Sequence, residues 1–528
     1  MTDGLLPLLV AVPVLAAVTP PLLGLRTTGT GWYVAAVACA VEAALAALVV
    51  RSVFLGGAVR HVVGGYERPY GIELVVDGLS APVVALVAVV SLGVLAFAYT
   101  AGPRRNSFYS AYLLLVGGLM GVSVTGDLFN MFVFLEITGL ATYALVAADR
   151  SGRSAVAALK YLILGTTGAS LFLIGVGYAF VETGTLNMVD LSERLAGSYG
   201  DRAVLASFGF VLVGLGLKTA VFPLHTWQPD AYSYAPDTVT TFISALVSTV
   251  AAYAIGRVIL TVFTPAFFEA VPAARTAVLA FAVVSILAGS ALAAVQTEIK
   301  RMLAYSSVSQ FGLVIAGFAL VTPDAVLGAV VHLVGHGLMK GGLFAAAGIM
   351  AARHGARTVG DYARLGYRSP VVAGTVGIFG VALVGIPPSV GFLGKWYIAV
   401  GAVRAGAWPI AVVVFLSTLL TLSYVARLLE RLYFAEPTDP TDPAVGARTD
   451  ADAGAGTGTG ADADSEVGAR DPDPVADGGA RADSRAPAAV STGMVAAIVA
   501  AAVVVVALGF AAAPFEAFLE RFLGGVFP

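Results

Sequence analysis

The chain has little charge and almost no cysteine. Only 12% of its 528 residues are Asp, Glu, Lys or Arg, against about 25% in soluble domains, whereas 58% are hydrophobic and the mean hydropathy is +0.88. Cys39 is the one cysteine and lies in an apolar stretch, which excludes a disulfide framework and a cysteine-based metal site. Nothing in the sequence indicates a bound flavin, nucleotide, iron–sulfur cluster or other cofactor, and we expect no nucleic-acid partner. This composition excludes a soluble globular protein.

Apolar runs recur along almost the whole chain. A bilayer's hydrocarbon core is ~30 Å thick and takes ~20 apolar residues to cross as a helix, so these runs predict an all-α, multi-pass membrane protein of about fourteen transmembrane helices. The predicted spans lie near residues 4–24, 31–54, 78–100, 108–125, 128–147, 155–182, 203–226, 236–263, 272–294, 302–321, 325–351, 370–402, 407–433 and 492–515. Because no basic residue opens the first segment and further spans follow it, we expect no cleaved signal peptide.

Lysine and arginine are distributed unevenly among the predicted loops. If the N-terminus lies outside, the inner loops hold more of these residues than the outer loops, although Arg51, Arg60 and Arg68 count against this orientation. We therefore expect a protein of the cell membrane with its N-terminus outside.

Residues 436–491 have a different composition from the rest of the chain. They are mostly Asp, Ala, Gly, Thr and Arg, with almost no large apolar side chain. Such a segment cannot bury enough surface to fold, so we expect a disordered acidic loop. One more span and an amphipathic tail, Phe515 to Phe527, follow it.

Two ionisable residues lie inside predicted spans of the first half. Glu136 is nine residues into the helix that Asp127 opens, about 13.5 Å at the usual helical rise and so near the middle of the membrane. Lys218 precedes a helix-breaking proline, Pro223, and a histidine, His225. Ionisable residues are costly in a membrane and indicate function by default. The alternatives are a structural carboxylate bonded to a neighbouring helix and a lysine satisfied by backbone carbonyls.

A second group of polar residues lies on one predicted helix of the second half. His332, His336 and Lys340 are spaced four apart and therefore share one helical face. Two histidines at this spacing could bind a metal ion, but no carboxylate or cysteine is nearby and a lysine shares the face. We favour a proton relay, because imidazole titrates near neutral pH.

The next span repeats the pattern found around Lys218. Pro387 and Pro388 interrupt it, and Lys395 follows. Interrupted segments at corresponding positions of two halves indicate internal repeats and the place where ions pass.

Four other charged features are less informative. We expect Glu42 to face a neighbouring helix or subunit and Asp77 to cap the start of a helix. Lys160 lies close enough to the end of its span to reach the interface, so a structural and a functional role remain equally open. The charged cluster 298–301 is interpreted as a topology anchor.

Several motifs together resemble a family of antiporter-like membrane subunits. They are Gly126-Asp127-Leu-Phe-Asn130…Glu136, Gly216-Leu-Lys218…Pro223-Leu-His225-Thr-Trp227…Pro229-Asp230, Lys300-Arg301-Met-Leu-Ala-Tyr305-Ser306-Ser307-Val-Ser309-Gln310, His332…His336…Lys340 and Gly385-Ile-Pro387-Pro388…Gly391-Phe392…Gly394-Lys395-Trp396. Over roughly residues 75 to 430 the chain is similar to the subunits shared by Mrp-type multisubunit Na+/H+ antiporters, respiratory complex I and membrane-bound hydrogenases. The sequence from Asn130 to Glu136 is most similar to that of the D-type Mrp subunit.

The resemblance implies a fold and a division of the chain. It implies two inverted five-helix repeats, with helices 7 and 12 broken. Residues 1–101 then form N-terminal helices, 102–265 and 266–435 the two repeats, 436–491 the acidic loop, and 492–528 a last helix and tail.

The resemblance also implies roles for individual residues. Glu136 and Lys218 match the family's proton-handling pair, His332 and His336 its linking histidines, and Lys395 the terminal lysine of the second repeat. Together they imply a central hydrated relay, which we expect to include His225 and Lys340.

One position departs from the family pattern. Alignment of Tyr253 to Arg257 places Thr249 where the family usually has a lysine in its eighth helix. Threonine carries no charge, so either water bound to its hydroxyl bridges the gap or the proton path is altered.

The expected function is therefore proton translocation within a larger assembly. We expect a subunit of a Na+/H+ antiporter, with other membrane subunits, the lipid bilayer, Na+ and H+ as partners, and no enzymatic activity of its own. The alternative is a non-catalytic subunit of a redox-driven proton pump such as complex I or a membrane-bound hydrogenase. A purely structural scaffold would not explain the charges within the membrane. The identity of the exchanged cation stays open.

Overall fold

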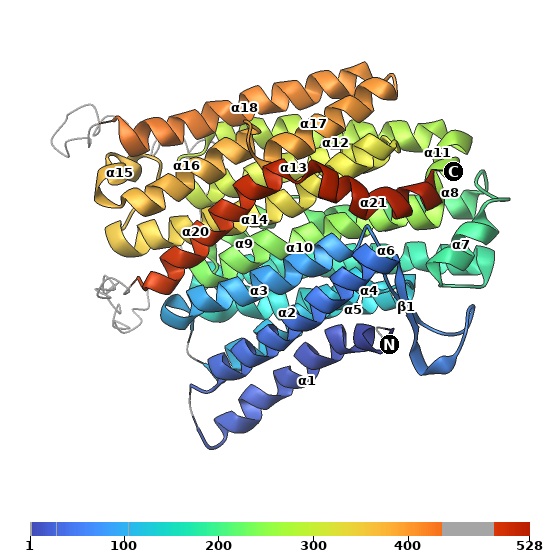
Figure 1. Ribbon diagram of the computed structural model, residues 1–528, viewed down its shortest axis with the longest axis horizontal. Coiled ribbons are helices and arrows are strands. Elements are labelled where there is room, and N and C mark those ends of the chain that lie inside the picture. Colours follow the sequence, from blue (N-terminus) through green and yellow to red (C-terminus); the bar gives the residue numbers. More distant parts are fainter. Residues whose placement is uncertain (1–2, 28, 104, 436–489, 528) are drawn as a thin grey trace, which may run out of the picture.

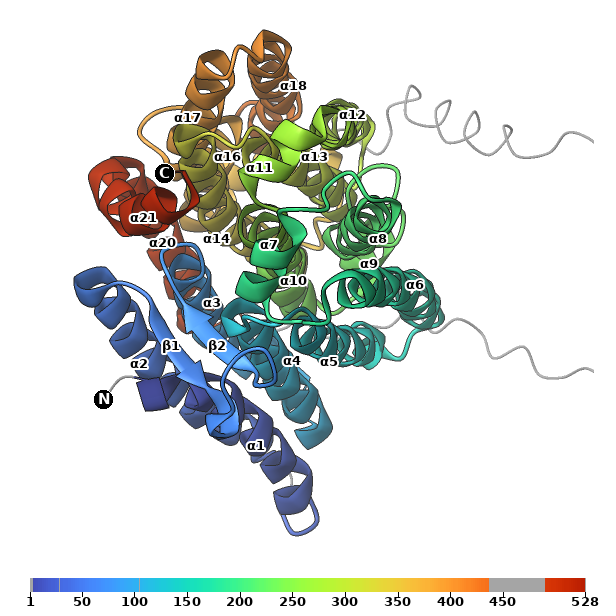
Figure 2. The ribbon, with the colours of Figure 1, turned by 90° about the vertical axis from the view of Figure 1, so that its right-hand side faces the viewer.

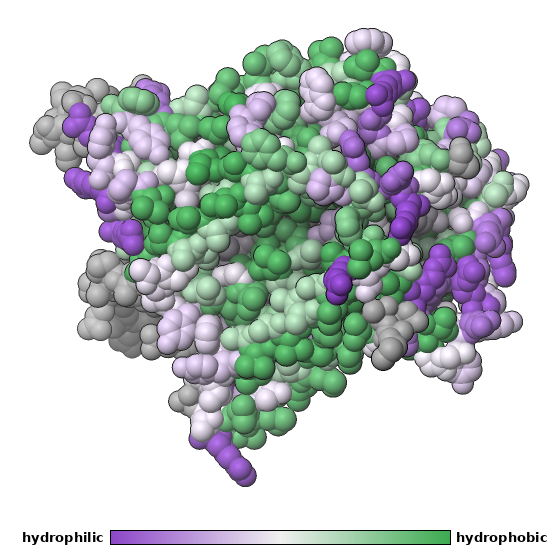
Figure 3. Space-filling view, in the orientation of Figure 1, coloured by the Kyte–Doolittle hydropathy of each residue, from purple (hydrophilic) through white to green (hydrophobic). Residues whose placement is uncertain are grey.

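The computed structural model describes residues 3–27, 29–103, 105–435 and 490–527. Within this part of the chain, thirteen helices are long and apolar enough to cross a membrane. They run side by side along the long axis of the molecule (Figure 1). Hydrophobic residues cover the middle of the face in Figure 3, and polar residues gather toward its two ends. The predicted all-α, multi-pass membrane fold is confirmed. Of the predicted acidic loop, 436–489 lie outside the described residues.

The long helices follow the predicted apolar runs closely. They are α1 (Leu6–Gly24), α2 (Gly31–Gly56), α3 (Ala81–Ala101), α4 (Asn106–Val124), α5 (Leu128–Val146), α6 (Gly152–Thr183), α8 (Arg202–Thr219), α10 (Asp237–Val258), α12 (Pro272–Val295), α13 (Ile299–Ala319), α14 (Pro323–His354), α18 (Trp408–Tyr433) and α20 (Thr492–Ala507). The predicted span 370–402 differs, because it forms two shorter helices, α16 (Pro370–Val384) and α17 (Val390–Arg404). This interruption accounts for thirteen long helices where about fourteen spans were expected from length alone.

Short helices join or follow the spans. They are α7 (Met188–Leu195), α9 (Gln228–Tyr234), α11 (Thr264–Ala270), α15 (Leu365–Arg368) and α21 (Ala512–Val526). A π-helical turn, Ile259–Phe263, links α10 to α11. Helix α21 is amphipathic and covers most of the predicted tail.

A small β-hairpin interrupts the helical pattern and was not predicted. Strands β1 (Val59–Val62) and β2 (Glu73–Val76) pair antiparallel, with Val59 opposite Val76. Both strands are rich in valine, whose branched side chain suits a pleated strand. Figure 2 looks onto the end of the bundle that carries this hairpin, α7 and α21.

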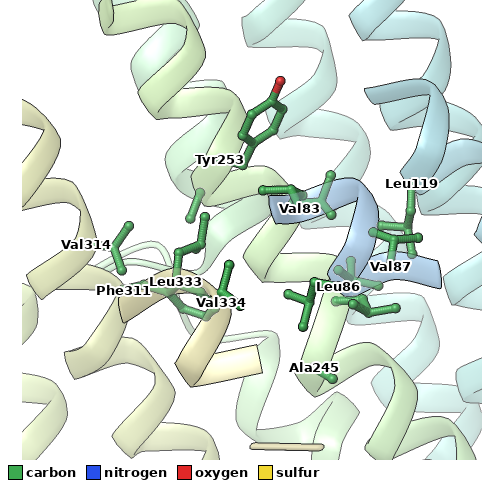
Figure 4. Packing of buried hydrophobic residues seen from close by; sticks show 14 of the residues in the cluster. Val83, Leu86, Val87, Leu119, Ala245, Tyr253, Phe311, Val314, Leu333 and Val334 are labelled. Atoms are coloured by element: carbon green, nitrogen blue, oxygen red, sulfur yellow. The ribbon is translucent and has the colours of Figure 1, made fainter. Parts of the chain in front are cut away.

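Three helices form the centre of the bundle. Helix α10 packs against α8 and α14, and α13 packs against α12 and α14. The membrane-spanning window of α14 is 100% buried inside the chain, whereas that of α20 is 22% buried. Figure 4 shows the apolar packing that holds the centre: Val83 of α3, Tyr253 of α10 and Phe311 of α13 lie among the labelled side chains. Polar residues in the middle of α14 are therefore enclosed by neighbouring helices.

Close helix contacts depend on glycine at two positions beside the central helices. A Cβ at Gly214 of α8 would lie 2.5 Å from the carbonyl oxygen of Gly168 on α6, and a Cβ at Gly394 of α17 would lie 2.6 Å from the Cβ of His332 on α14. Small residues allow helix backbones in a membrane to approach this closely. Gly394 thereby brings the second interrupted segment against the histidine-bearing helix.

Candidate proton-translocation site

The first interrupted segment ends a helix beside Lys218. Helix α8 ends at Thr219, and Ala220 has a left-handed backbone with φ of 66°. The sequence indicated a break at Pro223, four residues later. The helix stops earlier because a proline at 223 has no N–H for the carbonyl of Thr219 and its ring would collide with that carbonyl.

Side chains from other elements satisfy the backbone groups that the break releases. The indole N–H of Trp227 donates to the carbonyl of Leu217 at 2.9 Å. The main-chain N–H of Phe222 donates to the hydroxyl of Ser285 at 3.1 Å, and that hydroxyl donates to the carbonyl of Val308 at 3.0 Å. The break is therefore buried in protein, which is where irregular backbone is tolerated at membrane depth.

The structure brings Glu136 and Lys218 together. The Nζ of Lys218 lies 3.2 Å from Oε1 of Glu136 on α5, and the two side chains are 7% and 27% exposed. A Cβ at Gly139 would lie 3.2 Å from the Lys218 Nζ, so this glycine leaves room for the lysine along α5. The lysine is enclosed, while its carboxylate partner is the more accessible of the two.

His225 occupies the irregular segment after Lys218. It is buried, and its Nδ1 has no hydrogen-bond partner among the described residues. Its ring stacks on Phe222, with 5.2 Å between centroids, and lies edge-on to Tyr305 of α13 at 5.7 Å. It is placed between the first break and α13.

Helix α10 contributes hydroxyls, including Thr249, near the short helix α9. Thr249 is fully buried, and its hydroxyl has no hydrogen-bond partner in the described chain. Beside it, the Ser248 hydroxyl lies 3.2 Å from Nε2 of Gln228 and 3.4 Å from the hydroxyl of Tyr232. The sequence reasoning missed Gln228, whose position directly after Trp227 in the break was the available signal.

The three polar residues of α14 face α13, as their four-residue spacing predicts. His332 Nε2 lies 2.9 Å from Oε1 of Gln310. The His336 ring is edge-on to Phe311, with 4.6 Å between centroids. Neither of its nitrogens has a hydrogen-bond partner among the described residues. Lys340 donates to the carbonyl of Leu303 at 2.7 Å and to the hydroxyl of Ser306. All three residues of α14 are fully buried.

The second interrupted segment places Lys395 against the end of α16. Helix α16 ends at Val384, and Gly385 adopts a left-handed backbone with φ of 91°. Lys395 donates to the carbonyls of Leu383 and Val384 at 3.1 and 3.0 Å. The negative end of a helix dipole suits a cation. The two breaks differ in one respect: Lys218 precedes its break, whereas Lys395 follows the second one.

The charged cluster 298–301 binds acidic residues near α9 and α10. Asp230 lies 2.7 Å from the Nζ of Lys160 and 3.2 Å from the guanidinium of Arg301. Asp237 lies 2.6 Å from the Nζ of Lys300. Lys160 therefore has an acidic partner, and Lys300 and Arg301 of the cluster join α13 to the first half of the chain.

The described polar residues do not form one continuous hydrogen-bonded chain from Lys218 to Lys395. Between these lysines, however, buried side-chain atoms without a protein partner recur on successive elements. They are His225 Nδ1, Gln228 Oε1, Thr249 Oγ1, Gln310 Nε2, His332 Nδ1 and both ring nitrogens of His336. Buried polar atoms are nearly always hydrogen-bonded to protein or to ordered water. Each of these atoms is therefore a place where ordered water can bind.

A bundle of membrane helices with two breaks, each beside a buried lysine, is the architecture of an ion-translocating membrane subunit. Residues 125–421 match the family model described as NADH:quinone oxidoreductase/Mrp antiporter, TM. The chain belongs to this family and is a proton-translocating membrane subunit of the Mrp and complex I-like type.

Known relatives include subunits of NADH-quinone oxidoreductases and subunits of Na(+)/H(+) antiporters. The chain is 41% identical to the N-type subunit of the NADH-quinone oxidoreductase of Desulforudis audaxviator, covering 85% of this chain and 89% of that protein. It is 32% identical to the D-type subunit of the Na(+)/H(+) antiporter of Bacillus subtilis, covering 83% and 87%. A chain in the solved Mrp complex from Dietzia sp. DQ12-45-1b superposes with a TM-score of 0.83 at 28% identity, covering 100% of this chain and 97% of that one.

Proposed function

We propose that the chain moves protons as a membrane subunit of a multisubunit Na+/H+ antiporter, and that Glu136 and Lys218 form its proton-handling pair. The observation that carries this proposal is the 3.2 Å contact between their charged atoms at a helix break inside the bundle. A buried ion pair is weak evidence for stability alone, and intramembrane charges mark proton relays. The antiporter protein of Bacillus subtilis and the Mrp complex of Dietzia support this interpretation.

The proposed mechanism depends on the position of one carboxylate. A carboxylate at hydrogen-bond distance stabilises the charged form of a buried lysine, and burial without such a partner favours the neutral form. When a proton binds Glu136, the attraction to Lys218 falls and the pair opens. Lys218 then gives its proton to the next acceptor along the relay.

The unpaired polar atoms support a route for that proton. From Lys218 the route runs past His225 and the Gln228–Ser248 contact on α9 and α10. It continues along Lys340, His336 and His332 on α14 and ends at Lys395 of α17, whose neighbour Gly394 packs against His332. Water bound to these side chains carries the proton between them.

The spacing of the breaks supports the two proposed repeats. Residues 102–265 contain the spans α4, α5, α6, α8 and α10, and residues 266–435 contain α12, α13, α14, α16 with α17, and α18. The fourth span of each set is the interrupted one, as paired repeats with matching broken helices require. We also propose that the N-terminus lies outside, from the distribution of Lys and Arg.

The experiment uses inside-out vesicles that carry the chain with its natural partner subunits. Na+ is added to vesicles holding a pH gradient, and collapse of the gradient is followed for the wild type, Lys218→Ala and Glu136→Ala. Both variants should reach the membrane at normal levels and lose Na+-induced collapse. Arg404→Ala is the matched control, because Arg404 forms an ion pair with Asp324 with its side chain 67% exposed. Normal collapse in either site variant would refute the proposed pair.

One observation favours a second candidate function. The 41% identical relative is a subunit of an NADH-quinone oxidoreductase, so the same proton path could serve a redox-driven pump. The same vesicles separate the two functions: gradient formation on adding a reductant and quinone, without response to Na+, would assign the chain to a redox complex. In both cases Lys218→Ala should abolish proton movement.

A further inference from the structure

We propose that this chain binds a lipid with an anionic headgroup, with the headgroup beside Arg521 at the hairpin end of the bundle and one hydrocarbon chain in a cleft along α3, α14 and α20. The binding site has two parts, a charged pocket and an apolar cleft, which are joined at Phe518.

The charged pocket lies between the end of α2, the β-hairpin and α21. Its volume is about 330 Å³, and Arg60, Glu73, Asp77, Arg257 and Arg521 contribute its charged walls. Arg257 is paired with Asp77 at 2.6 Å, and Arg60 lies 3.4 Å from Glu73. Arg521 forms no ion pair with the described residues. The pocket thus has one arginine more than its acids neutralise.

Arg521 is placed to meet a ligand at the mouth of this pocket. A Cβ at Gly57 would lie 3.5 Å from its NH1, so the guanidinium lies over the glycine that directly follows α2. Arg60 is close to the same mouth, with its side chain 52% exposed. A guanidinium offers several donors in a planar fork that matches the oxygens of a phosphate group.

The apolar cleft continues from the pocket along the spans. Phe518 lines both the charged pocket and an adjoining cavity of about 290 Å³. That cavity shares Val89, Leu338 and Val504 with a third cavity of about 220 Å³. Of all the described side chains that line the two apolar cavities, Thr241 is the only polar one.

This order of surfaces matches an amphiphile that stands upright in a membrane. Charge lies at the end of the spans, and two adjoining apolar cavities with shared lining residues follow it along α3, α14 and α20. Basic pockets between membrane helices bind anionic lipid headgroups in this way. A lipid with an uncharged headgroup would leave Arg521 without an anionic partner. A free anion would leave the apolar cleft without an occupant.

The bound chain would lie against the relay helix. Gly337 and Gly341 line the cleft, and each directly follows a relay residue, His336 or Lys340. A hydrocarbon chain in the cleft would cover this side of α14 and keep water from leaving the relay toward the bilayer. This last step rests on the proposed proton path, whereas the binding site itself does not.

The test measures lipid retention and needs no transport activity. The complex that contains this chain is purified in detergent, depleted of lipid and exposed to vesicles of phosphatidylglycerol or of phosphatidylcholine. Native mass spectrometry then counts retained lipid. Arg521→Ala should lower phosphatidylglycerol retention about tenfold, through loss of charge-assisted hydrogen bonds. Arg202→Ala, at an exposed arginine that begins α8, is the control and should leave retention unchanged.

A second pair of variants tests the cleft. Gly93 lines the cleft on α3, and a Cβ built there meets nothing within 4 Å. Gly93→Phe therefore introduces a side chain into the cleft without a clash at its Cβ. Gly177 of α6 is equally open but lies elsewhere, and Gly177→Phe is the matched control. Gly93→Phe should also release phosphatidylglycerol.

Each outcome decides the proposal. Loss of phosphatidylglycerol in Arg521→Ala and Gly93→Phe, with both controls unchanged, supports it even if the transport tests fail. Equal retention of phosphatidylcholine would show that no headgroup is recognised and would overturn it. Stabilisation of the complex by inorganic phosphate alone, with lipid retention unchanged in Gly93→Phe, would indicate a free-anion site instead.

Discussion

The indole N–H of Trp227 donates to the main-chain oxygen of Leu217, the residue directly before Lys218. The Trp227 ring also stacks on Tyr161 of α6, with 3.8 Å between centroids and 4° between planes. The Trp227 side chain therefore donates to a carbonyl at the first break and also packs the interrupted segment against α6. The position of the Lys218 backbone depends on a residue that lies beyond the break in sequence.

Trp227→Phe should separate these two contributions. Phenylalanine keeps an aromatic ring against Tyr161 but cannot donate to the Leu217 carbonyl, which stays buried. The carbonyl keeps only its longer hydrogen bond, from the Ala220 N–H at 3.3 Å. Loss of the indole hydrogen bond costs about 0.5–1.5 kcal/mol, so the melting temperature of the purified complex should fall. Trp396→Phe, at a tryptophan that is 55% exposed, is the control and should change it little. Equal melting temperatures for the two variants would show that this hydrogen bond is unimportant.

Thr249 is the point at which the proposed route lacks a charged side chain. Its buried hydroxyl has no protein partner among the described residues, and bridging water can take that place. Thr249→Val keeps the shape and removes the hydroxyl, so proton translocation in vesicles should fall several-fold. Thr249→Ser keeps the hydroxyl and should retain activity. Full activity in Thr249→Val would mean that protons pass elsewhere.

Glu42 carries a buried carboxyl group that the proposed function does not use. It is fully buried in α2, and neither oxygen has a hydrogen-bond partner in the described part of the chain. Burial of an unpaired polar group costs about 1–3 kcal/mol, so Glu42→Met should raise the melting temperature. Glu269→Met, at an exposed position, should change stability by no more than about 0.5 kcal/mol. A fall in stability of Glu42→Met would show that the carboxyl has a partner in the assembled complex.

The sequence contained most of the fold but few of its long-range contacts. Apolar run length predicts the spans, because a helix must cross a hydrocarbon core of nearly constant thickness. Proline and glycine locate both interruptions, and the i, i+4 rule places His332, His336 and Lys340 on one face. These are local properties, and the structure bears them out.

Contacts between distant segments could not be predicted from the sequence in the same way. Asp230 had no sequence signal for its pairing with both Lys160 and Arg301, because that pairing depends on how α6, α9 and α13 pack. The β-hairpin was missed because its two strands are four residues each and lie in a loop of mixed composition. The contact of Glu136 with Lys218 was expected from family resemblance, since 82 residues separate them.

Asp77 makes one local contact of the kind that the sequence predicts and one long-range contact that it does not. Its Oδ1 accepts from the main-chain N–H groups of Leu79 and Ser80, just before α3, which is close to the expected capping role. Its main partner, however, is Arg257, which lies 180 residues later and donates from NH1 at 2.6 Å and from NH2 at 2.8 Å. The sequence reasoning treated Arg257 as an alignment marker and missed this pair.

The Asp77–Arg257 pair should make the stability of the complex depend on pH. Burial raises the pKa of Asp77, but the Arg257 guanidinium and the hydrogen bonds from Arg257, Ser80 and Leu79 outweigh burial and lower it below its ordinary value of 3.8. Because the folded pKa lies below the unfolded value, the stabilisation is present above about pH 4 and is lost as the pH falls through the folded pKa.

Asp77→Asn should therefore destabilise the complex at neutral pH and matter less in acid. The variant leaves Arg257 buried without a counter-ion, and breaking a buried pair in this way costs about 3–5 kcal/mol. Melting temperatures of wild type and Asp77→Asn, measured from pH 7 to pH 3, should differ by a constant amount above about pH 4 and converge below it. Asp324→Asn breaks an ion pair whose arginine is 67% exposed, and it should cost no more than about 1 kcal/mol at any pH. A gap between wild type and Asp77→Asn that stays unchanged at pH 3 would mean that the carboxylate charge is not what stabilises this contact. In that case the hydrogen bonds, which asparagine keeps only in part, would be its basis.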